Sequence, residues 1–68
     1  MMLFVKFKSG HALSIDCEEH DTVEALLREI SAEKSYDDID VSHKGNVLDR
    51  SRKLSDYEIY EGAVLHEV

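Results

Sequence analysis

The cysteine and the histidines carry the most reactive side chains in this chain of 68 residues. Cys17 and His20 have the C-x-x-H spacing of paired metal ligands, but a structural zinc site needs four ligands, and no second pair stands at such spacing. Ser42 and His43 place a hydroxyl beside a base. Neighbouring side chains of a strand point to opposite faces, so these two do not form a nucleophile and base pair. We therefore expect no metal site, no cofactor and no catalytic residue.

Carboxylates gather at two places in the sequence, Glu18 to Asp21 and Asp37 to Asp40. No glycine stands at the spacing of an EF-hand loop, which favours solvated loop charge over a cation site. The formal charge is -7, from 15 acidic and 8 basic residues, and the basic residues form no stripe with aromatic residues between them. This pattern argues against binding to nucleic acid.

The single cysteine, Cys17, cannot form an internal disulfide, which is typical of a protein from a reducing compartment. No apolar run is long enough to cross a bilayer, and Met1 to Phe7 lacks the layout of a signal peptide. We expect a cytoplasmic or nuclear protein that does not bind membranes. The length allows one core, so residues 1–68 are predicted to form one domain.

Two segments with alternating apolar residues, 1–8 and 13–17, flank the turn pair Ser9-Gly10, which predicts a β-hairpin. Cys17 lies on the inward side of the second strand, where it is expected to be a small buried hydrophobe. The four residues Val23, Leu26, Leu27 and Ile30 then form the apolar stripe of an amphipathic helix.

The start of this helix has two candidate caps, Asp21 and Thr22, and Glu24 after Asp21 resembles a capping box. Glu24 and Arg28 are also spaced for a pair on the solvent side. The helix is expected to end near Glu33 or Lys34, because residues 31–38 are polar and without apolar period.

The second half of the chain predicts three short strands, over residues 39–43, 47–48 and 64–68, with a turn at 44–46. Residues 54–59 have too little period for a helix of any length. The order is therefore ββαββ plus a last strand. One sheet with a helix across it is the economical arrangement for these apolar faces, and the fold class is α+β.

Several segments of the chain are similar to ubiquitin. They are Met1 to Lys6, Ser9-Gly10, Asp21 to Glu24, Leu54-Ser55-Asp56-Tyr57-Glu58-Ile59 and Leu65-His66. The Leu-Ser-Asp-Tyr-x-Ile segment is specific, and the resemblance spans the whole chain, with about two residues fewer between residues 31 and 38. It implies a ubiquitin-like β-grasp fold, in which one helix packs across a mixed sheet.

The resemblance also implies particular structural roles. Tyr57 corresponds to a buried tyrosine whose hydroxyl ties down the loop near Asp49, and Gly62 to a left-handed turn. His43 stands where an aromatic residue is common, so we expect it to be half-buried. The expected core is Leu3, Val5, Leu13, Ile15, Cys17, Val23, Leu26, Leu27, Ile30, Ile39, Val41, Leu48, Leu54, Ile59 and Leu65.

The main docking patch of ubiquitin corresponds here to Lys8, Ser42, His66 and Val68. Only His66 and Val68 keep the residue type of the family. Ser42 and Lys8 replace apolar anchors at positions where truncation commonly costs about 2 kcal/mol or more, and Asp40 reverses a nearby basic charge. The usual ubiquitin-binding helices are therefore expected to bind weakly, although Val47 adds some apolar contact.

A second surface has more apolar side chains, namely Met2 and Phe4 on the outer side of the first strand, with Val64 and Tyr60 beside them in the family fold. We expect these residues to form a protein-binding site shifted from the usual one. The alternative is that only Phe4 is exposed and Tyr60 covers backbone.

Two functions of different classes fit the resemblance. The first is a non-catalytic, monomeric interaction module of a larger protein in the ubiquitin and proteasome pathway or a related one. It would bind a proteasome subunit, a ligase, a deubiquitinase or another domain of its own chain. The chain stops at Val68 without the two glycines by which ubiquitin-like modifiers are conjugated. The second function, a covalent modifier, would need such a tail after Val68.

Overall fold

The strands and the helix expected from the sequence are present in the structure, a computed structural model that describes residues 1–34 and 39–68. The strands are β1 (Met2–Lys6), β2 (Ala12–Asp16), β3 (Val41–His43), β4 (Asn46–Val47) and β5 (Val64–Glu67). The α-helix is α1 (Val23–Lys34), and one turn of 3₁₀-helix, η1, covers Leu54–Tyr57. β3 begins two residues later than predicted, since Ile39 and Asp40 precede the paired segment.

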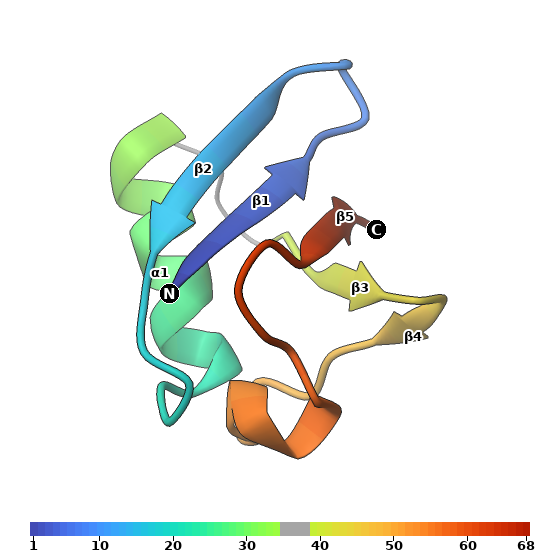
Figure 1. Cartoon of the computed structure of the whole chain (residues 1–68). Helices are drawn as coiled ribbons and strands as arrows, with labels where there is room; N and C mark the ends of the chain where they lie inside the picture. The colour runs from blue at the N-terminus through green and yellow to red at the C-terminus, as the bar shows by residue number, and fades with distance from the viewer. Residues whose placement is uncertain (35–38) are drawn as a thin grey trace.

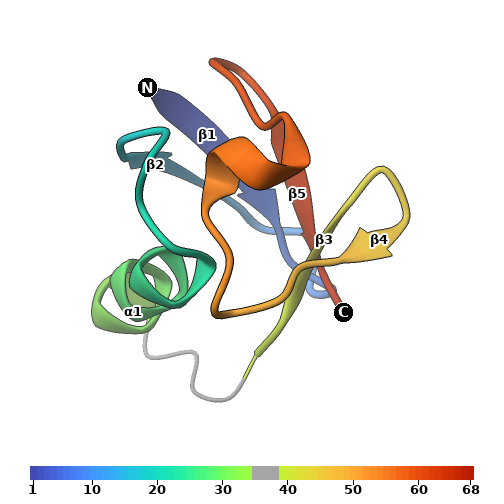
Figure 2. The ribbon, with the colours of Figure 1, turned by 90° about the horizontal axis from the view of Figure 1, so that it is seen from below.

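The five strands form one mixed sheet in the order β2-β1-β5-β3-β4. β1 is parallel to β5, and the neighbouring strands of the other three pairs are antiparallel. The first and last strands of the chain therefore lie next to each other in the middle of the sheet. α1 packs across one face of this sheet (Figures 1 and 2). A mixed sheet with one helix across it is the β-grasp arrangement, which confirms the predicted fold.

The core lies between α1 and the sheet. Its buried residues are Leu3, Val5, Phe7, Ile15, Cys17, Val23, Leu26, Leu27, Ile30, Val41, Leu48, Leu54, Ile59 and Leu65. Two predicted members, Leu13 and Ile39, are only partly buried. Leu13 belongs to β2, an edge strand with a neighbour on one side only, and Ile39 precedes β3. The predicted core did not include Phe7, which is buried. Its N–H donates a hydrogen bond to the His11 carbonyl at 2.8 Å, and this bond continues the alternation of β1 beyond Lys6.

Thr22 caps the amino end of α1, because its hydroxyl accepts a hydrogen bond from the Ala25 N–H at 3.1 Å. Asp21, the other candidate, instead accepts a bond from the Glu18 N–H at 2.9 Å. Glu24 does not reach back to form the expected capping box. Its carboxylate lies 3.1 Å from the Arg28 guanidinium, which is the i, i+4 pair predicted for the solvent side.

The loop after β4 provides further partners for α1. The N–H groups of Val23 and Glu24 donate to the carbonyls of Arg52 and Arg50, at 2.9 and 3.0 Å. These groups have no partner inside the helix, so the loop satisfies two of its first donors. In return the Leu54 N–H donates to the Asp21 carbonyl at 2.9 Å, which joins η1 to the same end of the helix.

η1 shows that the expectation of no helix in residues 54–59 was wrong. One turn is too short to produce an apolar period, and it is held by one local bond and by burial of Leu54 in addition to its bond to Asp21. The Asp56 carboxylate accepts a bond from the Lys53 N–H at 3.1 Å, and Leu54 anchors the turn in the core.

Some expectations fall on residues outside the described ranges, namely the shortened loop, of which residues 35–38 are not described, and the acidic pair Asp37 and Asp38. Across the described ranges, no helix has the length and apolar character needed to span a membrane.

Candidate functional site

The sheet face opposite α1, here called the outer face, carries exposed side chains from three central strands. Phe4 of β1 lies beside Val64 of β5, and Lys6 lies beside His66 in the next row. His66 is in turn opposite Ser42 of β3. Inward residues such as Val5 and Leu65 are fully buried, so alternation turns their neighbours outward.

Met2, Phe4, Tyr60 and Val64, here called the Phe4 cluster, come together at one end of the outer face. Their exposed fractions are 38%, 40%, 60% and 38%, and they account for four of the six large exposed hydrophobic residues in the described chain. Two bonds hold the turn that contains Tyr60 beside β1. The Gly62 N–H donates to the Met2 carbonyl at 2.8 Å, and the Phe4 N–H donates to Ala63 at 3.0 Å.

Gly62 makes this arrangement possible, because its φ of 84° lies in the left-handed region that glycine adopts easily. The left-handed turn expected at this position is confirmed. Exposure is not confined to Phe4, so the alternative in which Phe4 alone is exposed does not describe this surface.

The other four predicted site residues, Lys8, Ser42, His66 and Val68, belong to the opposite end of the same face. Lys8 and His66 are exposed, and Ser42 is half-buried between His66 and Val47, its register partners. Val47 and Val68 are 57% and 50% exposed. The middle of this region is therefore polar, with valines at its margin.

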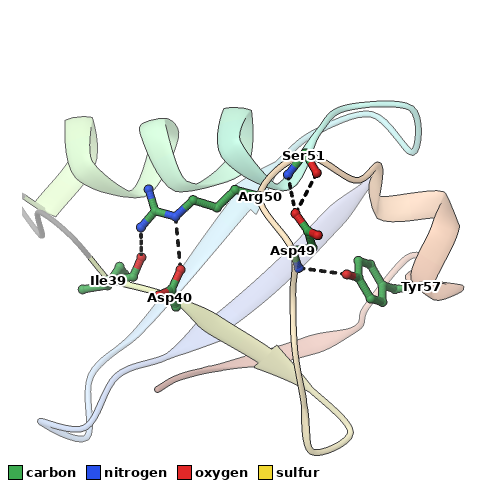
Figure 3. A network of polar contacts seen from close by, with 6 residues as sticks. All are labelled: Ile39, Asp40, Asp49, Arg50, Ser51 and Tyr57. Atoms are coloured by element: carbon green, nitrogen blue, oxygen red, sulfur yellow. Dashed lines mark hydrogen bonds and ion pairs between the residues drawn. The ribbon is translucent and has the colours of Figure 1, made fainter.

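Asp40 is not a free negative charge at this end of the sheet. Its carboxylate lies 3.2 Å from Nε of Arg50, and the same guanidinium donates to the Ile39 carbonyl at 2.9 Å (Figure 3). Both side chains are about half exposed, so solvent screens the pair and its contribution is about 0.2 to 1 kcal/mol. This role of Arg50 could not be predicted from the sequence, since a pair of residues ten positions apart across a loop produces no periodic pattern.

Tyr57 has the predicted role. Its hydroxyl oxygen accepts a hydrogen bond from the Asp49 N–H at 2.8 Å (Figure 3). The ring is half-buried, less than expected. The Asp49 carboxylate in turn accepts bonds from the Ser51 N–H and hydroxyl, at 2.9 and 2.7 Å. These bonds, the backbone one first, lower the pKa of Asp49 below its ordinary value.

Three of the reactive side chains in the described ranges, those of Cys17, His20 and His43, have different surroundings. Cys17 is buried, and its burial raises the pKa of the thiol, which keeps it in the unreactive protonated form. His20 is exposed and lies 3.5 Å from Glu19. His43 is half-buried as predicted, and this burial, together with the charge of Lys44, lowers its pKa. In the part of the chain that the structure describes, no three histidine, cysteine or acidic side chains are grouped to hold a metal ion.

The sequence was also compared with models of known protein families. The model described as "Ubiquitin family" matches residues 3–68, which is nearly the whole chain. This match covers the strands and helices described above except for Met2, the first residue of β1. The chain, with its β-grasp sheet and single crossing helix, therefore belongs to the ubiquitin family.

Proposed function

We propose that this chain is a non-catalytic protein-interaction domain that binds its partner through the Phe4 cluster. The observation that carries the proposal is the gathering of Met2, Phe4, Tyr60 and Val64 at one end of the outer face. Domains of the ubiquitin family generally mediate protein–protein interactions. Aromatic residues and methionine are enriched in the cores of interfaces, and this cluster contains both.

The partners proposed are proteins of the ubiquitin and proteasome pathway or a related one, in the cytoplasm or nucleus. A proteasome subunit, a ligase, a deubiquitinase or another domain of the same chain fits this proposal. The other end of the outer face is less suited to be the anchor. Ser42 and Lys8 stand in its middle, and polar residues there provide little apolar area for a partner to bury.

An NMR titration of the nitrogen-15-labelled domain tests the location of the site. The probes are the ubiquitin-receptor domains of the proteasome and, separately, a generic ubiquitin-binding helix. We expect the receptor domains to shift amides of β1, β5 and the turn before β5. Shifts confined to Lys8, Ser42, His66 and Val68 would show that the usual docking patch is used and would contradict the proposal.

Two matched variants make the test specific. Phe4→Ser with Val64→Ser removes apolar area from the Phe4 cluster, while Val47→Ser removes an exposed apolar side chain from the margin of the face. Both changes are at exposed positions, so the fold should be kept, and circular dichroism checks this. We expect the first variant to lose binding and the second to keep it.

The alternative function, a covalent modifier of the same family, leads to a different expected observation. The full gene product carrying an amino-terminal tag is expressed in its own cells and separated under denaturing conditions. An interaction domain gives one band, whereas a modifier gives a series of larger bands that survive denaturation. Such a series would replace the present proposal with the modifier function.

A further inference from the structure

We infer that two copies of this chain pair antiparallel through the outer edges of their β2 strands and so join their sheets into one. The inference goes beyond the proposed function, because it assigns a role to the edge of the sheet and does not depend on binding at the Phe4 cluster. Its basis is the backbone of β2, the lack of protection along this edge, and the match between β2 and an inverted second copy of itself.

β2 lies at one edge of the sheet, and part of its backbone points away from β1 (Figure 1). Met1 and Cys17 exchange both hydrogen bonds of their main chains, at 2.6 and 2.8 Å. Bonded pairs alternate with non-bonded pairs in an antiparallel ladder, so the backbones of Leu13 and Ile15 are bonded to β1. The residues whose N–H and C=O groups point to the outer edge are Ala12, Ser14 and Asp16. In the part of the chain that the structure describes, these backbone groups have no hydrogen-bond partner.

The edge of β2 lacks the usual protection of an edge strand. Proteins commonly shield such strands by lysine, proline, a bulge or a very short length. The opposite edge strand, β4, has only two residues, whereas β2 has five, without lysine, proline or a bulge. The outward side chains of β2 are short and exposed, so they leave room for a second strand. Pairing through β2 closes at two copies, because the short β4 strands at the two ends offer little backbone to further chains.

A twofold axis through Ser14 fits the sequence of β2. Ser14 is the middle residue of the strand, so this axis pairs all five residues with those of the second copy. Ser14 then lies opposite its own copy and Ala12 lies opposite Asp16, which gives about six backbone hydrogen bonds. On the side of α1, Leu13 lies opposite Ile15 of the second copy. Leu13 is only partly buried in one copy, and the pairing covers more of its apolar surface.

The charges along the edge are complementary in this register. Lys6 lies beside Ala12 on β1, and Ala12 faces Asp16 of the second copy. The Cα atoms of Lys6 and that Asp16 are then about 10 Å apart across one alanine, a distance that a lysine side chain and a carboxylate bridge together. The Met1 ammonium lies 3.4 Å from Asp16 within one copy, but the Asp16 side chain remains 83% exposed. In the same register Glu18 lies opposite a glycine, so no carboxylate faces another.

A concentration series of the nitrogen-15-labelled chain, followed by NMR and by sedimentation equilibrium, tests the pairing. The net charge of -7 on each copy opposes association, so the series runs from about 10 µM to about 1 mM. We expect a dimer at the upper end. The amide protons expected to move downfield with concentration, because each gains an acceptor, are those of Ala12, Ser14 and Asp16. The amides of Leu13 and Ile15 are already bonded to β1 and should move less.

Two outcomes of this series would overturn the inference. A monomer at every concentration, as expected from the family resemblance, would leave the edge of β2 for a strand of another protein. A dimer whose shifts are confined to β4 or to the Phe4 cluster would use a different surface.

A matched pair of variants separates the edge of β2 from the opposite edge. Ser14→Lys places two lysines opposite each other on the axis and should weaken the dimer about fivefold. Asn46→Lys adds the same charge to β4 and should not weaken it. Both positions are exposed, and circular dichroism checks that the fold is kept. Equal weakening by the two changes would count against pairing through β2.

An exchange of charges tests the register. Lys6→Asp and Asp16→Lys should each weaken the dimer about threefold, because each brings like charges together across the axis. The double variant restores opposite charges and should dimerise as tightly as the unchanged chain. Within one copy the two positions are four steps apart along β1, about 13 Å, so the coupling reports on contacts between copies. Additive effects of the two changes would contradict this register.

Discussion

His43 illustrates how one half-buried side chain connects stability to pH. Its pKa is lowered from 6.5, first by desolvation and then by Lys44, so the unfolded chain binds the proton more readily than the folded one. The contribution of His43 to the free energy of unfolding is therefore fully present above pH 6.5. It is lost as the pH falls from that value through the lower pKa of the folded state.

We predict that His43→Gln removes this part of the pH dependence. Urea unfolding at pH 7.5 and pH 5 measures it as the change in free energy of unfolding between the two conditions, which should be smaller in the variant. Lys44→Gln should reduce the dependence only in part, because desolvation remains. An unchanged difference in His43→Gln would assign the pH response to other groups.

Tyr57 offers a test of a single hydrogen bond. Tyr57→Phe removes the oxygen that accepts from the Asp49 N–H and keeps the ring, so we expect a loss of about 0.5 to 1.5 kcal/mol in the free energy of unfolding. Tyr60→Phe removes the same atom from an exposed ring and should change stability by less than about 0.5 kcal/mol. Equal effects of the two changes would contradict the role given to Tyr57.

At the scale of elements, the amino end of α1 shows that contacts with the rest of the fold determine which residue caps the helix. Both Asp21 and Thr22 are good caps by type, and the sequence left both open. Asp21 bonds the Glu18 N–H, and its carbonyl accepts from Leu54 of η1, so Thr22 becomes the cap.

We predict that Thr22→Ala lowers the free energy of unfolding by about 1 kcal/mol, because the Ala25 N–H loses its partner. Thr22→Ser keeps the hydroxyl and should recover most of the loss. Thermal unfolding of the three proteins gives the comparison. A loss of the same size in Thr22→Ser would point to packing of the methyl group instead.

Elements with a regular period could be predicted from the sequence, and elements without one could not. The alternation in β1 and the stripe from Val23 to Ile30 each repeat often enough to identify a strand and a helix. η1 is a single turn, and the Arg50 contacts join a loop to the two residues that precede β3, so neither feature produces a periodic pattern in the sequence. The role of Tyr57 was predicted from the family resemblance, since residue spacing does not indicate a hydrogen bond between residues eight positions apart.

At the scale of the whole molecule, the outer face has an apolar end and a polar end. Placing apolar residues at the polar end tests whether the usual docking patch of the family has lost its affinity for partners. Ser42→Ile with Lys8→Leu returns apolar anchors to the usual docking patch. We predict that this double variant gains about 2 kcal/mol in binding a generic ubiquitin-binding helix, measured by calorimetry.

Lys53→Leu, which lies outside the outer face, controls for non-specific hydrophobic binding and should not increase the affinity for the helix. The prediction is contradicted if the unchanged chain already binds that helix as tightly as the double variant does. The sequence predicted both sets of residues as binding sites, and this stays a prediction. It did not show that the two sets lie on one face of the sheet, because this depends on the β1–β5 and β3–β5 registers.

The central pairing of β1 with β5 also governs when the chain can fold during synthesis. Phe4 and Val64 lie opposite each other although they are 60 positions apart, so the two halves of the sheet meet only through the last strand. Closing so long a loop slows folding relative to local contacts. A ribosome-bound chain that has not yet released β5 therefore exposes the apolar side of β1 to chaperones and proteases, and native structure forms only after residue 67 has emerged.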